Sequence, residues 1–182
     1  MIDFERKVVF VHVPRTGGTS IEAAFGLIEQ SRKIHHFTAT ENEKLLKKKG
    51  ENPEDYYWFS FVRNPWDRVI SAYFQKTNRH IGQMYGHSLE HFLSQWNGIS
   101  GKSEHSRTQL GYLDNDLVNV FYFEHRTKVL TYLGQKFDMD FLSFHKRGSK
   151  RKTGYHQYFT KETRNIVAEM FREDIEYFGY TY

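Results

Sequence analysis

A short stretch near the amino end of the sequence combines glycines, hydroxyl groups and one fixed positive charge. Its residues are Arg15, Thr16, Gly17, Gly18, Thr19 and Ser20. Glycines let the backbone approach an oxyanion closely, and hydroxyls, amides and a guanidinium bind that anion. Where such a loop opens a helix, the unpaired amides of the first turn and the helix dipole add to the attraction. The stretch therefore predicts a site for a phosphate-like group.

This loop differs from the phosphate-binding loop of nucleotide triphosphatases, whose pattern is G-x-x-x-x-G-K-[ST]. No lysine precedes Thr19, and no glycine stands at the first position of the pattern. A second apolar stretch, at 56–62, is followed by Arg63 rather than by a magnesium-binding aspartate. A triphosphatase is therefore disfavoured, and a purely structural turn between a strand and a helix stays open as an alternative for the loop.

A second group of polar residues surrounds the expected start of a helix at Pro65. Its members are Arg63, Asn64, Arg68 and Ser71. A guanidinium matches a phosphate dianion through two parallel hydrogen bonds, so Arg63 is a candidate phosphate ligand. Two structural alternatives stay open. Arg63 could pair with an internal carboxylate, and Arg68 could hold the fold by pairing with Asp67 or Glu124.

The elements that must position these groups alternate between strand and helix. Apolar runs rich in β-branched and aromatic residues predict strands at 7–13, 56–62 and 117–123, with a weaker one at 33–36. Helical spacing predicts helices at 19–30, 41–49, 65–74 and 126–135, and a last one capped by Thr160. This order predicts an α/β fold, a three-layer domain with a central parallel sheet flanked by helices.

Length and composition narrow the class of protein. The 182 residues are typical of one domain spanning 1–182, and the formal net charge is +4. The absence of cysteine excludes a disulfide framework, a thiolate zinc site and a cysteine nucleophile. No secretory signal and no run of 18 apolar residues is visible, so we expect a soluble, cytoplasmic protein without a membrane partner.

Two segments together resemble a known family. VPRTGGTS at 13–20 and FSFVRNPWDRVISAYF at 59–74 resemble the two nucleotide-binding motifs of the sulfotransferases. The resemblance is greatest to the branch of Golgi carbohydrate sulfotransferases and their soluble bacterial relatives. It implies a P-loop-like domain and the sulfuryl donor 3′-phosphoadenosine 5′-phosphosulfate (PAPS). It also implies that the loop at 15–20 holds the phosphosulfate, and that Arg63 and Ser71 bind the 3′-phosphate.

Two further features are interpreted through this resemblance. Arg15 stands where the family commonly has lysine, and a guanidinium can still stabilise charge that develops on the bridging oxygen. The basic stretch at 145–152 resembles a family loop that covers the 3′-phosphate, which makes Arg151 and Lys152 candidate ligands. A solvated basic loop and a nucleic-acid patch are its alternatives. We expect no nucleic-acid partner, because no recognised binding module is visible.

Transfer to a hydroxyl needs a base within hydrogen-bond reach of the acceptor. The segment His36-Phe37-Thr38-Ala39 resembles the family's short histidine segment, so His36 is the predicted base. His35 and Glu124 stay open as alternatives, whereas His12 lies inside a strand and is predicted to belong to the core. An ordinary histidine base sets an acidic limb near pH 6.5 in the rate profile.

Together these features predict an enzyme, a PAPS-dependent sulfotransferase. It moves a sulfuryl group to a hydroxyl of a carbohydrate or another small molecule, without a metal ion. We also expect that a side chain at Gly18 would fill space meant for the phosphosulfate. A small-molecule or nucleotide kinase, and an inactive module that binds nucleotides or polyanions, are the alternative functions.

Overall fold

The computed structural model describes residues 1–26, 36–74, 88–98, 106–143 and 153–182. The chain forms two compact units. The first contains residues 1–62 and 109–147, and the second contains residues 63–108 and 148–182. The expectation of one domain over 1–182 stays a prediction.

The first unit is built on a four-stranded sheet with the order β1-β2-β3-β4. Its strands are β1 (Ile2–Asp3), β2 (Val8–Val11), β3 (Tyr57–Val62) and β4 (Asn119–Tyr122). β2, β3 and β4 are parallel to one another, and β1 is antiparallel to β2. The carboxyl ends of the three parallel strands therefore lie at one edge of the sheet, where α/β proteins bind ligands. The mixed α/β class with a mostly parallel sheet is confirmed.

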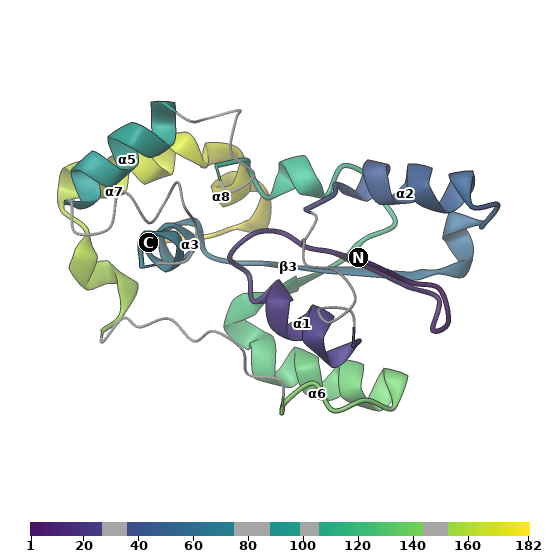
Figure 1. Ribbon diagram of the computed structural model, residues 1–182. Helices are drawn as coiled ribbons and strands as arrows, with labels where there is room; N and C mark the ends of the chain where they lie inside the picture. The colour runs from purple at the N-terminus through teal and green to yellow at the C-terminus, as the bar shows by residue number, and fades with distance from the viewer. Residues whose placement is uncertain (27–35, 75–87, 99–105, 144–152) are drawn as a thin grey trace. The chain divides into compact units, whose positions relative to one another are not determined.

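Both faces of β2 and β3 are covered by helices of the same unit (Figure 1). On one face, Phe10 and Phe59 pack with side chains of α1 (Gly18–Ala24) and α6 (Arg126–Phe137). On the other face, Val11 and Trp58 pack with α2 (Ala39–Lys48). Burial on both sides explains why these strands are continuous apolar runs rather than alternating ones.

A capping box fixes the start of α2. The Thr38 side chain accepts a hydrogen bond from the backbone N–H of Glu41 at 3.1 Å, and the Glu41 carboxylate accepts one from the N–H of Thr38 at 2.7 Å. Such a box satisfies two of the free amides at a helix start. Because Thr38 is held in this way, the segment that carries His36 enters the helix in one defined direction.

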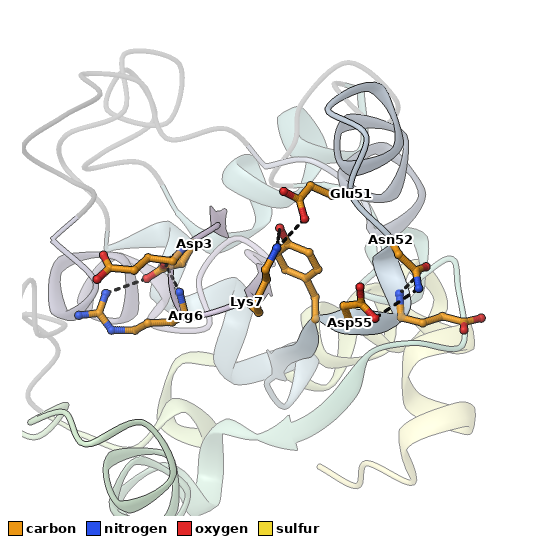
Figure 2. A network of polar contacts seen from close by, with 9 residues as sticks. Asp3, Arg6, Lys7, Glu51, Asn52 and Asp55 are labelled. Carbon is orange, nitrogen blue, oxygen red and sulfur yellow. Dashed lines mark hydrogen bonds and ion pairs between the residues drawn. The ribbon is translucent and has the colours of Figure 1, made fainter.

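Polar contacts hold the amino ends of β2 and β3 together, as Figure 2 shows. Lys7 precedes β2 and has a positive φ of 52°. Its ammonium lies 2.6 Å from the Glu51 carboxylate and 3.4 Å from the hydroxyl of Tyr56, which precedes β3. In the preceding turn, Asp3 accepts hydrogen bonds from Arg6. These contacts lie at the end of the strands opposite to the ligand edge, so they serve the sheet and not the site.

The second unit is helical and contains α3 (Pro65–Tyr73), α5 (Leu89–Gly98), α7 (Lys161–Met170) and α8 (Arg172–Phe178). Its core is an apolar cluster made of Trp66, Val69, Ile70, Ala72, Leu89, Phe92, Leu93, Trp96, Val167 and Phe171. Thr160 caps α7, as the sequence predicts, and it does so through a reciprocal pair of hydrogen bonds with Thr163. The last helix is nevertheless two helices, because the chain breaks at Phe171, whose φ is −122°.

Most predicted elements have counterparts that differ by a few residues at their ends. The weak strand predicted at 33–36 falls outside the described residues except for His36, which is not part of a strand. The end of the helix predicted at 19–30 also falls outside them. β1, the short helical turns and α5 were not predicted from the sequence.

Candidate functional site

The loop between β2 and α1 has an unusual backbone. Arg15 has a φ of 72° and Gly17 a φ of 85°, so two left-handed residues flank Thr16. Thr16 is almost fully buried, and its hydroxyl donates to the carbonyl of Val13 at 2.8 Å. A left-handed conformation is uncommon for a long side chain and is typical of functional sites. Turns of this kind also gather backbone N–H groups into a concavity that suits an anion.

The two glycines of the loop are required by their protein neighbours. A Cβ atom on Gly18 would lie 2.2 Å from a ring carbon of His12, and one on Gly17 would lie 3.0 Å from the ring of Phe123. We expected a side chain at Gly18 to occupy the space of the ligand. The structure gives a different reason for this glycine, because the side chain would first meet His12. Gly18 lacks a side chain because the imidazole of His12 occupies that space.

Arg126 lies beside this loop, and the sequence analysis did not identify it. Its Nε lies 3.6 Å from the position of a Cβ on Gly17, and the guanidinium lies 6.0 Å from the ring centre of Phe123. Burial lowers the pKa of this half-buried arginine from its usual value. Arg126 follows β4 after one short turn, so its place beside the loop follows from the common edge of the parallel strands. Its place directly after the third predicted parallel strand is the feature of the sequence that could have identified Arg126.

His12 connects the loop with the candidate base. It is buried, as predicted, and its Nδ1 lies 2.9 Å from the Oε1 of Glu22 on α1. Its carbonyl oxygen lies 3.0 Å from the Nδ1 of His36, and the two imidazole rings are 4.5 Å apart in an edge-to-face arrangement. His12 thus contacts the backbone at Gly18, the carboxylate of Glu22 and the ring of His36. Glu22 was not recognised from the sequence.

His36 has a defined protonation state in this arrangement. A carbonyl oxygen only accepts hydrogen bonds, so the Nδ1 of His36 carries a hydrogen. Burial, with the nearby positive charge of His12, lowers the pKa of His36 to about 4. The imidazole is therefore neutral at pH 7, and Nε2 is the nitrogen that bears the lone pair. The expected acidic limb near pH 6.5 is corrected to about pH 4, because the imidazole is partly buried beside another histidine.

In the second unit, the other predicted ligands are Arg63, which precedes α3, and Ser71, which lies on α3. The Nε of Arg63 donates to the Asp67 carboxylate at 2.7 Å, and both residues are buried. Asp67 and the buried Ser71 are four residues apart on α3, so they share one face of the helix. Arg63 and Ser71 thus lie along the same side of α3. The pairing with Asp67 also agrees with the structural alternative for Arg63.

The start of α3 is fixed by Asn64. Its side-chain oxygen accepts from the N–H of Trp66 at 3.1 Å, and its amide donates to the carbonyl of Thr181 at 2.8 Å. Pro65 occupies the first helical position, as predicted. The asparagine therefore holds the turn that carries Arg63.

Arg68 has a structural role in the same unit. It donates to the carbonyl of Arg107 at 2.9 Å and lies 3.9 Å from the carboxylate of the fully buried Asp174. Its guanidinium is also 5.4 Å from the ring centre of Phe171. This arrangement matches the fold-holding alternative for Arg68, with Asp174 as the carboxylate partner.

The remaining predicted site residues divide into described and undescribed ones. Thr19 and Ser20 lie in the first turn of α1, and Glu124 lies exposed in the turn Phe123–His125 after β4. His35, Arg151 and Lys152 lie outside the described residues. The loop, His36 and Glu124 belong to the first unit, whereas Arg63 and Ser71 belong to the second.

Comparison with known proteins identifies the class. A family model described as "Sulfotransferase family" matches residues 1–112, more than half of the 182 residues. The chain therefore belongs to the sulfotransferase family, whose members transfer sulfuryl groups, and the family predicted from the sequence is confirmed. The match contains the loop, His36, Arg63 and Ser71. Comparisons with curated proteins and with solved structures found no match.

Within the described ranges, no helix is both long enough and apolar enough to cross a membrane. Among the same residues, no group of three or more histidine, aspartate or glutamate side chains is placed to hold a metal ion.

Proposed function

We propose that this protein is a PAPS-dependent sulfotransferase that moves a sulfuryl group to a hydroxyl of a carbohydrate or another small molecule. The observation that carries the proposal is the loop with left-handed Arg15 and Gly17, at the ligand edge of the sheet in a chain of this family. Helices on both faces of β2 and β3 support a P-loop-like, three-layer fold.

The loop suits the phosphosulfate end of the donor. Arg15 supplies a positive charge, and the backbone turn from Thr16 to Ser20 supplies N–H groups at the start of α1. Arg126 adds a second guanidinium beside Gly17. Since phosphosulfate is anionic, two guanidinium groups and a set of backbone donors match its charge.

The roles of Arg63 and Ser71 follow from the family resemblance and agree with their shared side of α3. Arg63 binds the 3′-phosphate through its guanidinium, and Ser71 donates its hydroxyl. The ion pair with Asp67 orients the guanidinium of Arg63 before the ligand binds. Arg151 and Lys152 cover the same phosphate in this proposal.

PAPS supplies an activated sulfuryl group on a good leaving group. His36 accepts the hydroxyl proton at Nε2 while the acceptor oxygen bonds to sulfur and the bond from sulfur to the phosphate oxygen breaks. Arg15 stabilises the electron pair that stays on that phosphate oxygen. His36 is ready for this role because it is neutral at pH 7 and its ring is held by the carbonyl of His12. No step in this scheme requires a metal ion.

Thermal unfolding in the presence of nucleotides tests the proposal against a kinase. Adenosine 3′,5′-bisphosphate with EDTA should stabilise the protein by about 2.7 kcal/mol at 100 times its Kd. That corresponds to a rise in Tm of about 5–10 °C for a chain of this size. Stabilisation by ATP with Mg²⁺, and not by the bisphosphate, would overturn the proposal.

A further inference from the structure

A buried carboxylate–imidazole pair, formed by the side chains of Glu22 and His12, lies beside the proposed base. Glu22 and His12 are each less than a tenth exposed, and the carboxylate accepts from the Nδ1 of the imidazole at 2.9 Å. Burying a carboxylate is costly unless it is well hydrogen-bonded, and the imidazole of His12 provides that hydrogen bond. α1 positions Glu22, and the end of β2 positions His12.

The pair reaches His36 through His12. The carbonyl of His12 accepts the Nδ1–H of His36, and the ring of His12 packs edge-to-face against the ring of His36. The Glu22 carboxylate in turn keeps a hydrogen on the Nδ1 of His12 and holds that ring in one orientation. The ring of His12 is also packed against Gly18, the first residue of α1, at the place where a side chain of residue 18 would lie.

We propose that Glu22 and His12 are positioning residues for His36. Glu22 fixes the ring of His12, and that ring fixes the orientation of His36 by edge-to-face packing. The backbone carbonyl of His12 fixes the tautomer of His36, so that Nε2 is the proton-accepting nitrogen. The catalytic consequence rests on the proposed function, but the structural relation among the three side chains does not.

Three titratable groups influence His36 in this arrangement. The pKa of His36 is lowered first by burial and then by charge on His12. It is raised by the hydrogen bond to the carbonyl of His12 and by the negative charge of Glu22. The amino group of Met1 adds a smaller lowering effect. Replacing the ring of His12 removes both burial and a positive charge, so the pKa of His36 must rise toward 6.5.

Nitrogen-15 NMR of histidine-labelled full-length protein reads this relation directly. In the wild type, His36 should carry its hydrogen on Nδ1 at pH 7 and titrate near pH 4. In His12→Asn, the pKa of His36 should rise by at least about one pH unit. Glu22→Gln keeps an acceptor oxygen but loses the charge, and it should change the spectrum of His12 and, through it, that of His36.

The double variant Glu22→Gln/His12→Asn shows whether Glu22 affects His36 through His12 or independently of it. If Glu22 orients His36 through the ring of His12, adding Glu22→Gln to His12→Asn should leave the His36 spectrum unchanged at about pH 8, where His36 is neutral. The direct effect of the Glu22 charge on the pKa of His36 appears only in the titration and is expected in both backgrounds. Glu43→Gln on α2 and His91→Asn on α5 are matched controls, since both residues are far less buried and are not part of the pair. Unchanged His36 spectra in both single variants would overturn the proposal, as would equal additional effects of Glu22→Gln on the spectrum at about pH 8 in both backgrounds.

Kinetics supply a second readout that a loosened fold would not reproduce. Glu22→Gln should lower kcat about 10- to 100-fold, the usual effect of losing a partner that orients a functional histidine. The Kd for adenosine 3′,5′-bisphosphate should stay unchanged, because the loop keeps its glycines and Arg15. Equal losses in kcat and in bisphosphate affinity would show that Glu22 serves the fold alone. If no sulfuryl transfer is found at all, the proposed function fails while the NMR result still decides this inference.

Discussion

At the scale of single residues, the proposed chemistry depends on a histidine that stays neutral. The Nδ1–H of His36 is directed to a backbone carbonyl, and burial next to His12 lowers the pKa of His36 to about 4. A neutral imidazole accepts a proton, whereas an imidazolium cannot. The base is therefore available over the whole physiological pH range. A low pKa also makes it a weaker base, so its position must contribute much of the effect.

The His36→Ala variant tests this assignment. General-base contributions are typically about 10²- to 10⁴-fold, so kcat should fall within that range while bisphosphate affinity is kept. The wild-type kcat should stay level between about pH 7 and pH 5, because the pKa of His36 is lowered to about 4. Single-turnover sulfuryl transfer at saturating donor measures both. A limb near pH 6.5, or loss of activity in Glu124→Gln but not in His36→Ala, would contradict the assignment.

Arg126 and Ser71 should respond differently to two nucleotides. Arg126→Ala should weaken adenosine 5′-monophosphate and the 3′,5′-bisphosphate by the same factor, about 10- to 100-fold, because Arg126 lies beside the loop. Ser71→Ala should weaken the bisphosphate alone, by about 3- to 30-fold. Calorimetry measures all four affinities.

Lys128→Ala is the matched control for Arg126, since Lys128 is exposed on the same helix. Ser71→Ala is a cleaner test than Arg63→Ala, because removing Arg63 also removes the ion-pair partner of the buried Asp67. A loss confined to the bisphosphate in Arg126→Ala would place that residue at the 3′-phosphate instead.

At the scale of elements, the loop and α1 are held together by the contact of Gly18 with His12. A Cβ at Gly18 would lie 2.2 Å from the buried imidazole, so Gly18→Ala should destabilise the protein by about 1–3 kcal/mol, as overpacking does. Gly154→Ala is the control, because its φ is −59° and no atom lies within 4 Å of its Cβ position. It should be neutral or slightly stabilising. Urea denaturation compares the two, and equal stabilities would refute the contact.

The elements that were predictable from sequence are those whose pattern is strong and local. β2 and β3 are continuous apolar runs, and α3 begins with an asparagine cap followed by proline. β1 has two residues, too few to show any period. The break at Phe171 lies inside a run whose apolar spacing continues into α8, so periodicity alone suggested one helix.

The candidate site was predictable only where a residue belongs to a contiguous motif. Arg15, Gly17 and Gly18 stand in one loop, and the loop could be recognised. Glu22 and Arg126 join the site through tertiary contacts with His12 and Gly17, and no spacing in the sequence reveals such contacts. The pKa of His36 could not be predicted from the sequence either, since it depends on burial and on the neighbouring ring of His12.

At the scale of the whole molecule, His36 should make stability depend on pH. Its pKa is about 4 in the folded protein against an ordinary value of 6.5, so the unfolded chain binds more protons between these two pH values. Stability is therefore present above pH 6.5 and is lost as the pH falls toward 4, by at most about 3 kcal/mol. Urea denaturation at pH 7 and pH 4.5 should show a smaller decrease for His36→Gln than for the wild type. Identical decreases would mean that His36 titrates normally.

The central claim concerns the group that is transferred. The most direct measurement offers sulfur-35-labelled PAPS and a panel of carbohydrate, phenol and amine acceptors to the full-length protein in EDTA. We predict that label appears on a hydroxyl acceptor together with an equal amount of adenosine 3′,5′-bisphosphate, and that His36→Ala slows both equally. Transfer of phosphate from ATP that requires Mg²⁺, in a protein that neither binds nor consumes PAPS, would contradict the claim.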